Sequence, residues 1–364
     1  MSQTGEPTVR VAVAGAGAFG RNHLRVYREL ETAGKGVELV AALELDAGRA
    51  AAVAEKYAIP VFTSVDELLR ANLRVNAASV AVPTVHHHAV ASALLDAGLD
   101  LLVEKPLAAS LAEADELLVL AAKKEHILQP GHLERFNPAV LAVQPKLRRP
   151  MFFEAHRLSI FTPRALDVDV VLDLMIHDLD IVLTFAHSPV REVRAVGLPI
   201  LSPKVDIANV RVEFESGCVA NFTASRVSTE RVRKLRFFEP RQYVSIDYAR
   251  QELLLIRLDG SVPPEIAAAL AAGKIDAAAL AQLAAGGAGA GPGPGLSFAK
   301  PPVTPGEPLR LEIESFLDAV RTRREPRVTA RQGRDALELA LEIQASMVAH
   351  ADRAGLRSFF EAGA

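Results

Sequence analysis

At 364 residues, half of them apolar and 23% charged, the chain is long enough for about two globular domains with sizeable cores. Its formal net charge of −3 provides no basic field that would attract nucleic acid or an anionic membrane. Cys218 is the only cysteine, which excludes an intrachain disulfide and fits a reducing compartment. With no signal-peptide pattern in residues 1–8 and no apolar run of membrane-spanning length, we expect a cytoplasmic protein without nucleic-acid or membrane partners.

The first predicted strand, residues 9–14, leads through a glycine-rich turn into a helical pattern over 21–33. This strand–turn–helix order, with the spacing G-x-G-x-x-G, is the one that a dinucleotide pyrophosphate needs. The first glycine allows the turn, the second lets the backbone approach the phosphates, and the third lets the helix lie against the strand. The residues predicted to bind the cofactor here are Gly15, Gly17, Ala18, Phe19 and Gly20.

A second buried strand is predicted over 37–43, and it ends at Glu44. An acidic residue at this position hydrogen-bonds the adenosine ribose hydroxyls and repels a 2′-phosphate. Glu44 therefore favours NAD over NADP. The alternative interpretation is that Glu44 is simply the solvated end of a strand.

Strands and helices then alternate up to residue 130. This alternation is typical of a doubly wound parallel sheet, which binds ligands outside the carboxyl ends of its strands. Glu104 and Lys105 follow such a strand, on the same edge as the glycine-rich turn, and this position favours a site role over a solvated turn. The predicted strands are 60–62, 77–82, 99–103 and 127–132, and the predicted helices are 47–57, 65–71, 87–97 and 111–124.

Residues 131–364 are predicted to form a second, α+β domain with a mixed, largely antiparallel open sheet. Several strand-like runs adjoin without room for crossover helices, which indicates antiparallel neighbours. Residues 261–306, rich in Ala, Gly and Pro, are interpreted as a mobile surface insertion. Helices predicted at 309–322 and 331–353 are expected to pack on this second domain. The expected strands are 151–158, 190–198, 207–215, 217–227, 231–238 and 242–248.

One amphipathic helix, predicted at about 169–185, carries Asp173 and His177. Residues four apart share one face of a helix, so the carboxylate can orient the imidazole and favour its charged form. From spacing alone, a surface ion pair is the simpler interpretation.

Several other polar residues have weaker signals. Asn137, just before Pro138, is a good helix cap, and a role in substrate binding is a second possibility because the preceding strand end points toward the cofactor cleft. Arg157, near the end of the strand that opens the second domain, is a candidate substrate contact. A set of basic residues on the predicted strands could include a contact to a substrate phosphate. Such alternating charges more often lie on the solvent-exposed face of a sheet. The residues are Arg226, Arg231, Arg233, Lys234 and Arg236.

No metal site is expected. Three consecutive histidines, residues 86–88, point roughly 100° apart on a helix and cannot all reach one ion.

Together these motifs resemble the Gfo/Idh/MocA oxidoreductases, a family that includes glucose–fructose oxidoreductase and inositol dehydrogenase. In that family a Rossmann domain carries the glycine-rich loop, a Pro-Thr step with a nearby His after the fourth strand, and Glu-Lys-Pro after the fifth. The matching residues after the fourth strand are Pro83, Thr84 and His87, and those after the fifth are Glu104, Lys105 and Pro106. The resemblance implies that these residues, up to Lys105, contact the cofactor.

The resemblance also implies chemistry. The family carries an Asp-x-x-x-His pair on the helix of its second domain, acting with the lysine of Glu-Lys-Pro, so Lys105, Asp173 and His177 are the expected catalytic residues. The expected reaction transfers a hydride between a secondary alcohol of a sugar and NAD, with NADP the less favoured cofactor. A lysine accepts a proton near neutrality only when its pKa is lowered, as burial beside a charged cofactor would do. Lys105, Asn137, Arg157 and His177 are the predicted substrate contacts.

The segments 131–138, 173–180 and 225–236 resemble the nucleotide-sugar branch of the family, the UDP-N-acetylglucosamine 3-dehydrogenases, which make a 3-keto sugar for later amination. Two alternatives remain: a dehydrogenase of another polyol such as an inositol, and a non-catalytic NAD-binding regulator. The regulator would need the glycines but not Lys105, Asp173 and His177. An open sheet in the second domain would leave a face to cover, which favours a homodimer or homotetramer.

Overall fold

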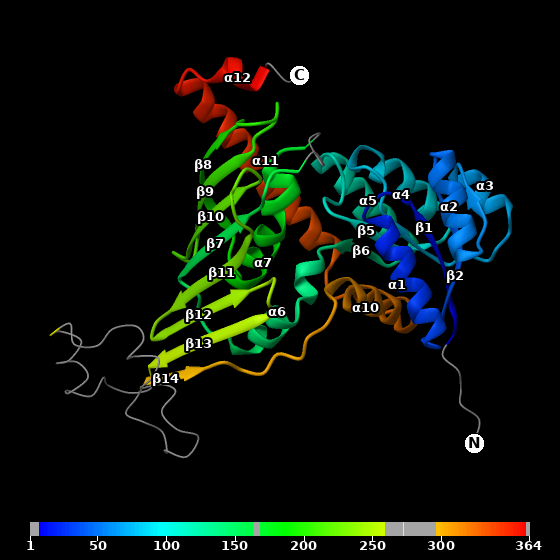
Figure 1. Cartoon of the computed structure of the whole chain (residues 1–364), viewed down its shortest axis with the longest axis horizontal. Helices are drawn as coiled ribbons and strands as arrows, with labels where there is room; N and C mark the ends of the chain where they lie inside the picture. Colours follow the sequence, from blue (N-terminus) through cyan, green and yellow to red (C-terminus); the bar gives the residue numbers. More distant parts are fainter. Residues whose placement is uncertain (1–6, 163–167, 259–271, 273–295, 362–364) are drawn as a thin grey trace. The chain divides into compact units, whose positions relative to one another are not determined.

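The computed structural model describes residues 7–162, 168–258, 272 and 296–361 (Figure 1). The chain forms two compact units. Unit 1 comprises residues 1–136 and 306–341, and unit 2 comprises residues 137–305 and 342–364.

Unit 1 is built on a sheet of six parallel strands in the order β3-β2-β1-β4-β5-β6. This is the Rossmann strand order, so the predicted doubly wound sheet is confirmed. Its strands are almost wholly apolar because helices cover both faces of such a sheet. They are β1 (Val9–Ala14), β2 (Val37–Leu43), β3 (Val61–Phe62), β4 (Ala77–Val80), β5 (Asp100–Glu104) and β6 (Leu128–Gly131).

Three helices of unit 1 begin at a residue whose side chain caps them. Asp46, Ser64 and Ser110 each accept a hydrogen bond from a backbone N–H in the first turn of the helix that follows. The helices are α1 (Gly20–Thr32), α2 (Ala47–Tyr57), α3 (Val65–Arg70), η1 (Thr84–His86), α4 (His87–Asp96), α5 (Leu111–Lys124) and η2 (Leu133–Phe136).

The helix α10 (Pro308–Thr322) belongs to the core of unit 1, so the expectation that it packs on the second domain is wrong. Its apolar face, which includes Ile313 and Phe316, is fully buried in the same cluster as Val11 and Leu24. The apolar spacing predicted the helix correctly but could not say which core receives it, because either sheet offers an apolar face. The long α11 (Ala330–Arg353) contributes its first half to unit 1 and its second half to unit 2.

Unit 2 contains a sheet of eight strands in the order β14-β13-β12-β11-β7-β10-β9-β8. Every pairing is antiparallel except that between β7 and β10, which confirms a mixed, largely antiparallel sheet. The strands are β7 (Phe152–Leu158), β8 (Val190–Leu198), β9 (Ile207–Phe214), β10 (Val219–Ser225), β11 (Val232–Glu239), β12 (Gln242–Asp247), β13 (Glu252–Leu258) and β14 (Leu296–Ala299).

Two of these strands were not predicted. β13 pairs with β12, and β14 pairs with β13. β14 falls inside the predicted Ala/Gly/Pro-rich insertion of residues 261–306, so for residues 296–299 that interpretation is wrong: the backbone is paired in the sheet. The rest of the prediction falls mainly on residues 259–271 and 273–295, which lie outside the described residues.

One face of this sheet carries helices. Figure 1 shows α6 (Pro138–Val143), α7 (Ile176–Ala186) and the second half of α11 on the same side of it. Alternate residues such as Phe153, Phe222 and Phe237 are buried beneath them. No described helix covers the opposite face, where Phe238 is 37% exposed. The remaining described helices of unit 2 are η3 (Gln144–Lys146), the π-helical turn η4 (Val171–Met175) and α12 (Arg357–Glu361).

Candidate active site

The glycine-rich loop has the geometry that a dinucleotide requires. Gly15 has φ +91°, and a Cβ placed on it would lie 2.6 Å from the carbonyl oxygen of Ala81. A Cβ on Gly20 would lie 1.8 Å from the carbonyl oxygen of Gly15, so the third glycine allows α1 to begin against the loop. A Cβ on Gly17 would meet no atom within 4 Å, so the backbone there faces open space that phosphate oxygens can enter.

Glu44, at the end of β2, is 7% exposed and bonds to the glycine-rich loop. One carboxylate oxygen accepts from the backbone N–H of Ala16 at 3.0 Å, and the other accepts from Asp46 N and from Arg49 at 2.9 and 2.8 Å. Burial by itself raises the pKa of Glu44, but these donors outweigh it and lower the pKa to about 2. The carboxylate is therefore ionised and held beside the loop, and the interpretation of Glu44 as a merely solvated strand end is wrong.

Beside this loop lies a pocket of about 200 Å³. Its apolar lining can receive a flat ring, and its basic side chains can receive an anionic group. The residues that line it are Ala16, Arg21, Arg49, Ala52, Val53, Lys56 and Tyr57.

The carboxyl end of β5 carries Glu104 and Lys105. Glu104 is buried, and its Oε1 lies 2.9 Å from Nε2 of His23, a fully buried residue of α1. The other ring nitrogen of His23 lies 3.1 Å from Ser79 Oγ, which in turn is 2.8 Å from the hydroxyl of Tyr27. Lys105, the next residue after Glu104, is partly exposed.

His87 joins the two loops that follow β4 and β5. It is 1% exposed, and its ring nitrogens lie 2.8 Å from the Pro106 carbonyl and 2.9 Å from the Val82 carbonyl. Burial lowers the pKa of His87, although both carbonyls favour the charged ring. His87, which was predicted to contact the cofactor, is therefore a buried residue that connects these two loops. The exposed Pro83 and the half-buried Thr84 follow β4 and open η1.

In unit 2, Asp173 and His177 occur where the helix changes its winding. Asp173 lies in the π-helical turn η4, where the backbone N–H of Ile176 bonds to the Val171 carbonyl, and His177 lies in the first turn of α7. The predicted regular helix over 169–185 is therefore replaced by a π turn followed by an α-helix. π turns inside helices occur frequently at functional sites. Both side chains are partly exposed.

Arg157 and Asn137, predicted as substrate contacts, are both buried in unit 2. The guanidinium of Arg157 donates to both carboxylate oxygens of Asp178 at 2.7 and 3.0 Å and lies 5.0 Å from the ring centroid of Tyr248. Asn137 donates to the Tyr248 carbonyl at 3.0 Å and accepts from Ala139 N, which confirms its predicted role as a helix cap. Because Asp178 adjoins His177 in α7, the pairing of Arg157 with Asp178 holds the helix that carries His177.

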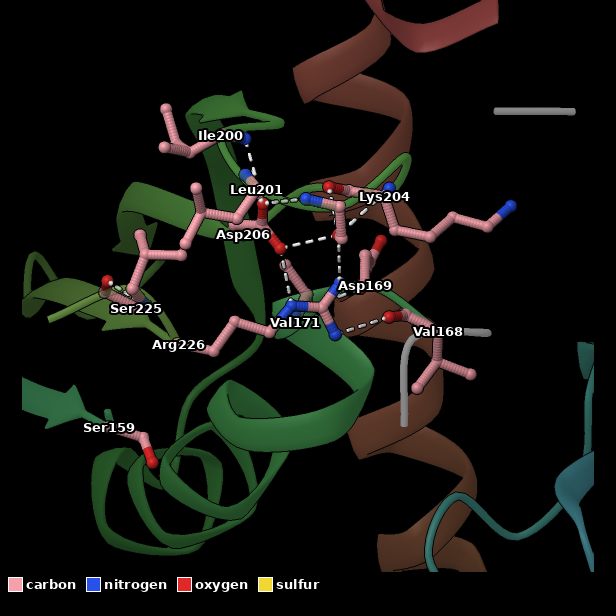
Figure 2. Close-up of polar contacts among 12 residues, drawn as sticks. Ser159, Val168, Asp169, Val171, Ile200, Leu201, Lys204, Asp206, Ser225 and Arg226 are labelled. Atoms are coloured by element: carbon pink, nitrogen blue, oxygen red, sulfur yellow. Dashed lines mark hydrogen bonds and ion pairs between the residues drawn. The ribbon is translucent and has the colours of Figure 1, made fainter. Parts of the chain in front are cut away.

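A second buried cluster anchors the start of the same helix (Figure 2). Arg226 donates to Asp206 at 2.7 Å and to the Val168 carbonyl at 2.9 Å. Asp169, next to Val168, accepts from the backbone N–H groups of Val171 and Leu172 at the start of η4. Asp206 also holds the loop before it, accepting from Ile200 N, Leu201 N, Ser202 N and Ser202 Oγ.

Arg226 is 4% exposed and its guanidinium bonds to Asp206 and Val168, which favours a structural role in this buried cluster over a phosphate contact. Arg236 forms an ion pair with Glu154 on the neighbouring strand at 2.9 Å, as expected for a charged residue on the solvent-exposed face of the sheet. Over the described ranges, no three His, Cys, Asp or Glu side chains gather as a metal site requires. In the same part of the chain, no helix is both long and apolar enough to cross a membrane.

The structure thus connects Glu44 to the glycine-rich loop, and Glu104 and His87 to the backbone around Lys105. Sequence reasoning missed His23, Arg49 and Asp178. His23 had a readable signal, because it occupies the same helical stripe as Tyr27 and Leu30, where a lone polar residue among apolar ones requires a buried partner. Arg49 and Asp178 look like ordinary surface charges in the sequence.

Two comparisons by family model cover most of the chain. Residues 9–132 match the oxidoreductase family with an NAD-binding Rossmann fold, and residues 140–241 match the Gfo/Idh/MocA C-terminal domain. Among curated proteins, the UDP-N-acetylglucosamine 3-dehydrogenase of Acidithiobacillus ferrooxidans is 33% identical over 95% of this chain and 99% of its own length. The inositol 2-dehydrogenase of Acidothermus cellulolyticus is 31% identical over 52% of this chain and 57% of its own.

Solved structures agree with these matches. The crystal structure of the Acidithiobacillus enzyme superposes with a TM-score of 0.80 at 32% identity and covers 94% of this chain and 98% of that chain. A levoglucosan dehydrogenase in complex with NADH and L-sorbose has a TM-score of 0.76 over 94% of this chain and 97% of that chain, at 16% identity, which shows the fold alone.

Proposed function

Because the chain belongs to the Gfo/Idh/MocA oxidoreductase family, whose relatives are dehydrogenases of CH–OH groups, we propose that it oxidises the 3-hydroxyl of a nucleotide sugar such as UDP-N-acetylglucosamine, with NAD as cofactor. The observation that carries this substrate choice is the extent of the similarity. The nucleotide-sugar relative matches through both units, whereas the inositol relative matches about half of the chain.

The proposed cofactor position uses unit 1 alone. The pyrophosphate would bind the backbone of Gly17, Ala18, Phe19 and Gly20, and the adenosine would enter the neighbouring pocket of about 200 Å³. Glu44, ionised beside that loop, would accept the ribose hydroxyls and repel a 2′-phosphate, which supports NAD over NADP. Pro83 and Thr84, after β4, would line the path toward the nicotinamide.

Bound NAD would supply the hydride acceptor, and the protein must supply a base for the hydroxyl proton. We assign that role to Lys105 together with His177, with Asp173 orienting the imidazole and stabilising its charged form. Glu104, His87, Asn137 and Arg157 are buried and bonded to protein groups, so in this proposal they hold the catalytic side chains in place.

We also propose that the protein is a homodimer or homotetramer. The face of the eight-stranded sheet opposite α6 and α7 carries an aromatic cluster of Phe152, Phe238 and Tyr243, with ring centroids 5.4 and 5.2 Å apart. Apolar surface of this kind favours a partner, and a second copy of the same sheet would cover it symmetrically. A reducing cytoplasmic location agrees with the single, buried, free Cys218.

The test is the formation of reduced cofactor with a panel of UDP-N-acetylglucosamine, UDP-glucose and myo-inositol. We expect turnover with UDP-N-acetylglucosamine that Lys105→Met lowers by about 10²–10⁴-fold, the usual contribution of a general base. The matched control is Lys123→Ala, at an exposed lysine on α5, which should behave as the wild type. Turnover with myo-inositol alone would contradict the nucleotide-sugar assignment, and no turnover with any alcohol would favour a regulator.

A further inference from the structure

A buried chain of four polar side chains runs beneath the loop that carries Lys105. It starts at Tyr27 in α1, passes through Ser79 in β4 and His23 in α1, and ends at Glu104, with successive separations of 2.8, 3.1 and 2.9 Å. His23 and Ser79 are fully buried, and Glu104 is 7% exposed. Buried polar groups are retained when each has a partner, and these four partner one another.

The chemistry of these four groups indicates which one donates each hydrogen bond. Burial raises the pKa of Tyr27, so its hydroxyl stays protonated and can donate to Ser79. Ser79 can then donate to Nδ1 of His23, whose other ring nitrogen, Nε2, carries the proton that faces Glu104. Oε1 of Glu104 accepts from that N–H. In this arrangement each of the four groups has a hydrogen-bond partner within the chain.

We propose that His23 is a positioning residue for Lys105, and this inference rests on the function proposed above. His23 holds the carboxylate of Glu104, and Glu104 is covalently joined to Lys105. On the other side of Lys105, the Pro106 carbonyl is held by His87 at 2.8 Å. The backbone of Lys105 is therefore fixed on both sides by buried histidines.

The neighbouring strand leaves room for this arrangement. A Cβ placed on Gly131 of β6 would lie 2.8 Å from Oε1 of Glu104, the oxygen that His23 contacts. Any larger residue at position 131 would displace the carboxylate or the strand. Gly131 thus explains how a carboxylate fits at the end of an interior strand, and it identifies a second position through which the same geometry can be disturbed.

Two substitutions separate positioning from packing. His23→Leu removes both polar contacts, whereas His23→Gln keeps an amide N–H at about the place of Nε2. We expect His23→Leu to lower kcat by about 10- to 100-fold, the loss typical of a small misplacement of a reacting group. His23→Gln should recover most of that activity. NADH affinity should change by less than about threefold in both, because the interaction lost acts on the chemical step.

A double-mutant cycle gives a further readout. In a Glu104→Gln background, His23→Leu should cost little more, since the two residues act as one unit. Equal losses for the Leu and Gln variants, or a full additive cost in the Glu104→Gln background, would overturn the inference.

A spectroscopic readout keeps the inference independent of the substrate. In long-range ¹H–¹⁵N spectra of protein labelled with [¹⁵N]histidine, His23 is identified by the signal missing from His23→Gln. We expect the Nε2–H tautomer and a change of its signal in Glu104→Gln; the Nδ1–H tautomer, or a signal indifferent to Glu104, contradicts the inference. If the wild-type protein oxidises no sugar, the proposed function fails, while the tautomer still decides whether His23 holds Glu104.

Discussion

Glu44 accepts a hydrogen bond from the backbone N–H of Ala16, 28 residues earlier and inside the glycine-rich loop. The strand end that would recognise the adenosine ribose is thereby tied to the loop that would bind the pyrophosphate. The same carboxylate holds Arg49, whose side chain is half exposed at the pocket beside the loop. Glu44 therefore places a negative charge beside the loop, and it also determines whether the positive charge of Arg49 is available to a ligand.

Removal of Glu44 should relax the choice of cofactor. Glu44→Ala eliminates the charge that repels a 2′-phosphate and releases Arg49 to bind one. We expect the ratio of kcat/KM for NADP to that for NAD to rise by at least about tenfold, which corresponds to about 1.4 kcal/mol. Glu55→Ala, at an exposed carboxylate on α2, is the matched control for net charge. An enzyme that prefers NADP, with a preference that Glu44→Ala leaves unaltered, would contradict the role given to Glu44.

Asp173 and His177, the proposed acid–imidazole pair of unit 2, should act mainly on the chemical step. His177→Asn is expected to lower kcat by about 10²–10⁴-fold, while NADH affinity stays close to that of the wild type. Asp173→Asn should show a smaller loss, because an orienting group is removed and the imidazole remains. His156→Gln, on the face of the sheet without described helices, serves as the control. Activity of His177→Asn within a few-fold of the wild type would remove His177 from the proposed mechanism.

The buried pair of Arg226 and Asp206 should stabilise unit 2 in a pH-dependent way. Burial by itself raises the pKa of Asp206, but Ser202, Arg226 and backbone donors lower it well below its usual range. Because the folded pKa is depressed, the stabilisation is complete above the unfolded pKa of about 3.9 and is lost as the pH falls through the folded value.

Thermal unfolding of Asp206→Asn tests this dependence. At pH 7 the variant should lose about 3 kcal/mol, as buried pairs do when one partner is neutralised. The difference in Tm from the wild type should shrink as the pH falls below about 4, where the carboxyl of Asp206 begins to protonate in the unfolded chain while it stays ionised in the folded one. Glu215→Gln, at an exposed site of the same unit, should show neither effect. A difference in Tm that is constant from pH 7 to pH 3 would mean that the charge of Asp206 is not what stabilises the fold.

Cys218 should be unreactive in the folded protein. It is 1% exposed, and burial raises the pKa of its thiol to about 11, so little thiolate exists at neutral pH. Because the chain has one cysteine, labelling with a thiol reagent reports on this site alone. We expect slow labelling in buffer and rapid labelling of one thiol per chain in denaturant. Fast labelling of the native protein would show that β10 opens readily at its start.

Phe238 should contribute to self-association. Phe238→Lys places a charge in the aromatic cluster on the sheet face that no described helix covers, and should shift the protein toward smaller species in sedimentation velocity. Val348→Lys, an exposed apolar position on α11, is the control. If Phe238→Lys sediments as the wild type does, the interface lies elsewhere.

Local patterns in the sequence were enough to predict the Rossmann half of the fold. The doubly wound parallel sheet follows from alternating strands and helices, and the helix caps at Ser64 and Asn137 follow from their neighbours. These features depend on residues close together in the chain. The assignment of α10 to unit 1 and the pairing of β14 with β13 do not, and both were missed.

In the candidate site too, some features could be predicted from local sequence and others could not. The glycine-rich loop could be read from its spacing after a strand, and Lys105, Asp173 and His177 were proposed because their motifs resemble those of a known family. The partners of Glu104, His87, Arg157 and Arg226 could not. A charged side chain looks the same in sequence whether it meets water or a buried partner, and only the folding of distant segments decides which it meets.

The sequence by itself therefore determined the fold class and the cofactor loop, since both depend on short-range periodicity and turn chemistry. Its resemblance to a known family supplied the candidates for catalysis. Only the tertiary structure decided that His23 holds Glu104 and that Asp178 holds Arg157. Those pairs join residues 81 and 21 positions apart. Their stability comes from being enclosed together, away from water, which no local pattern encodes.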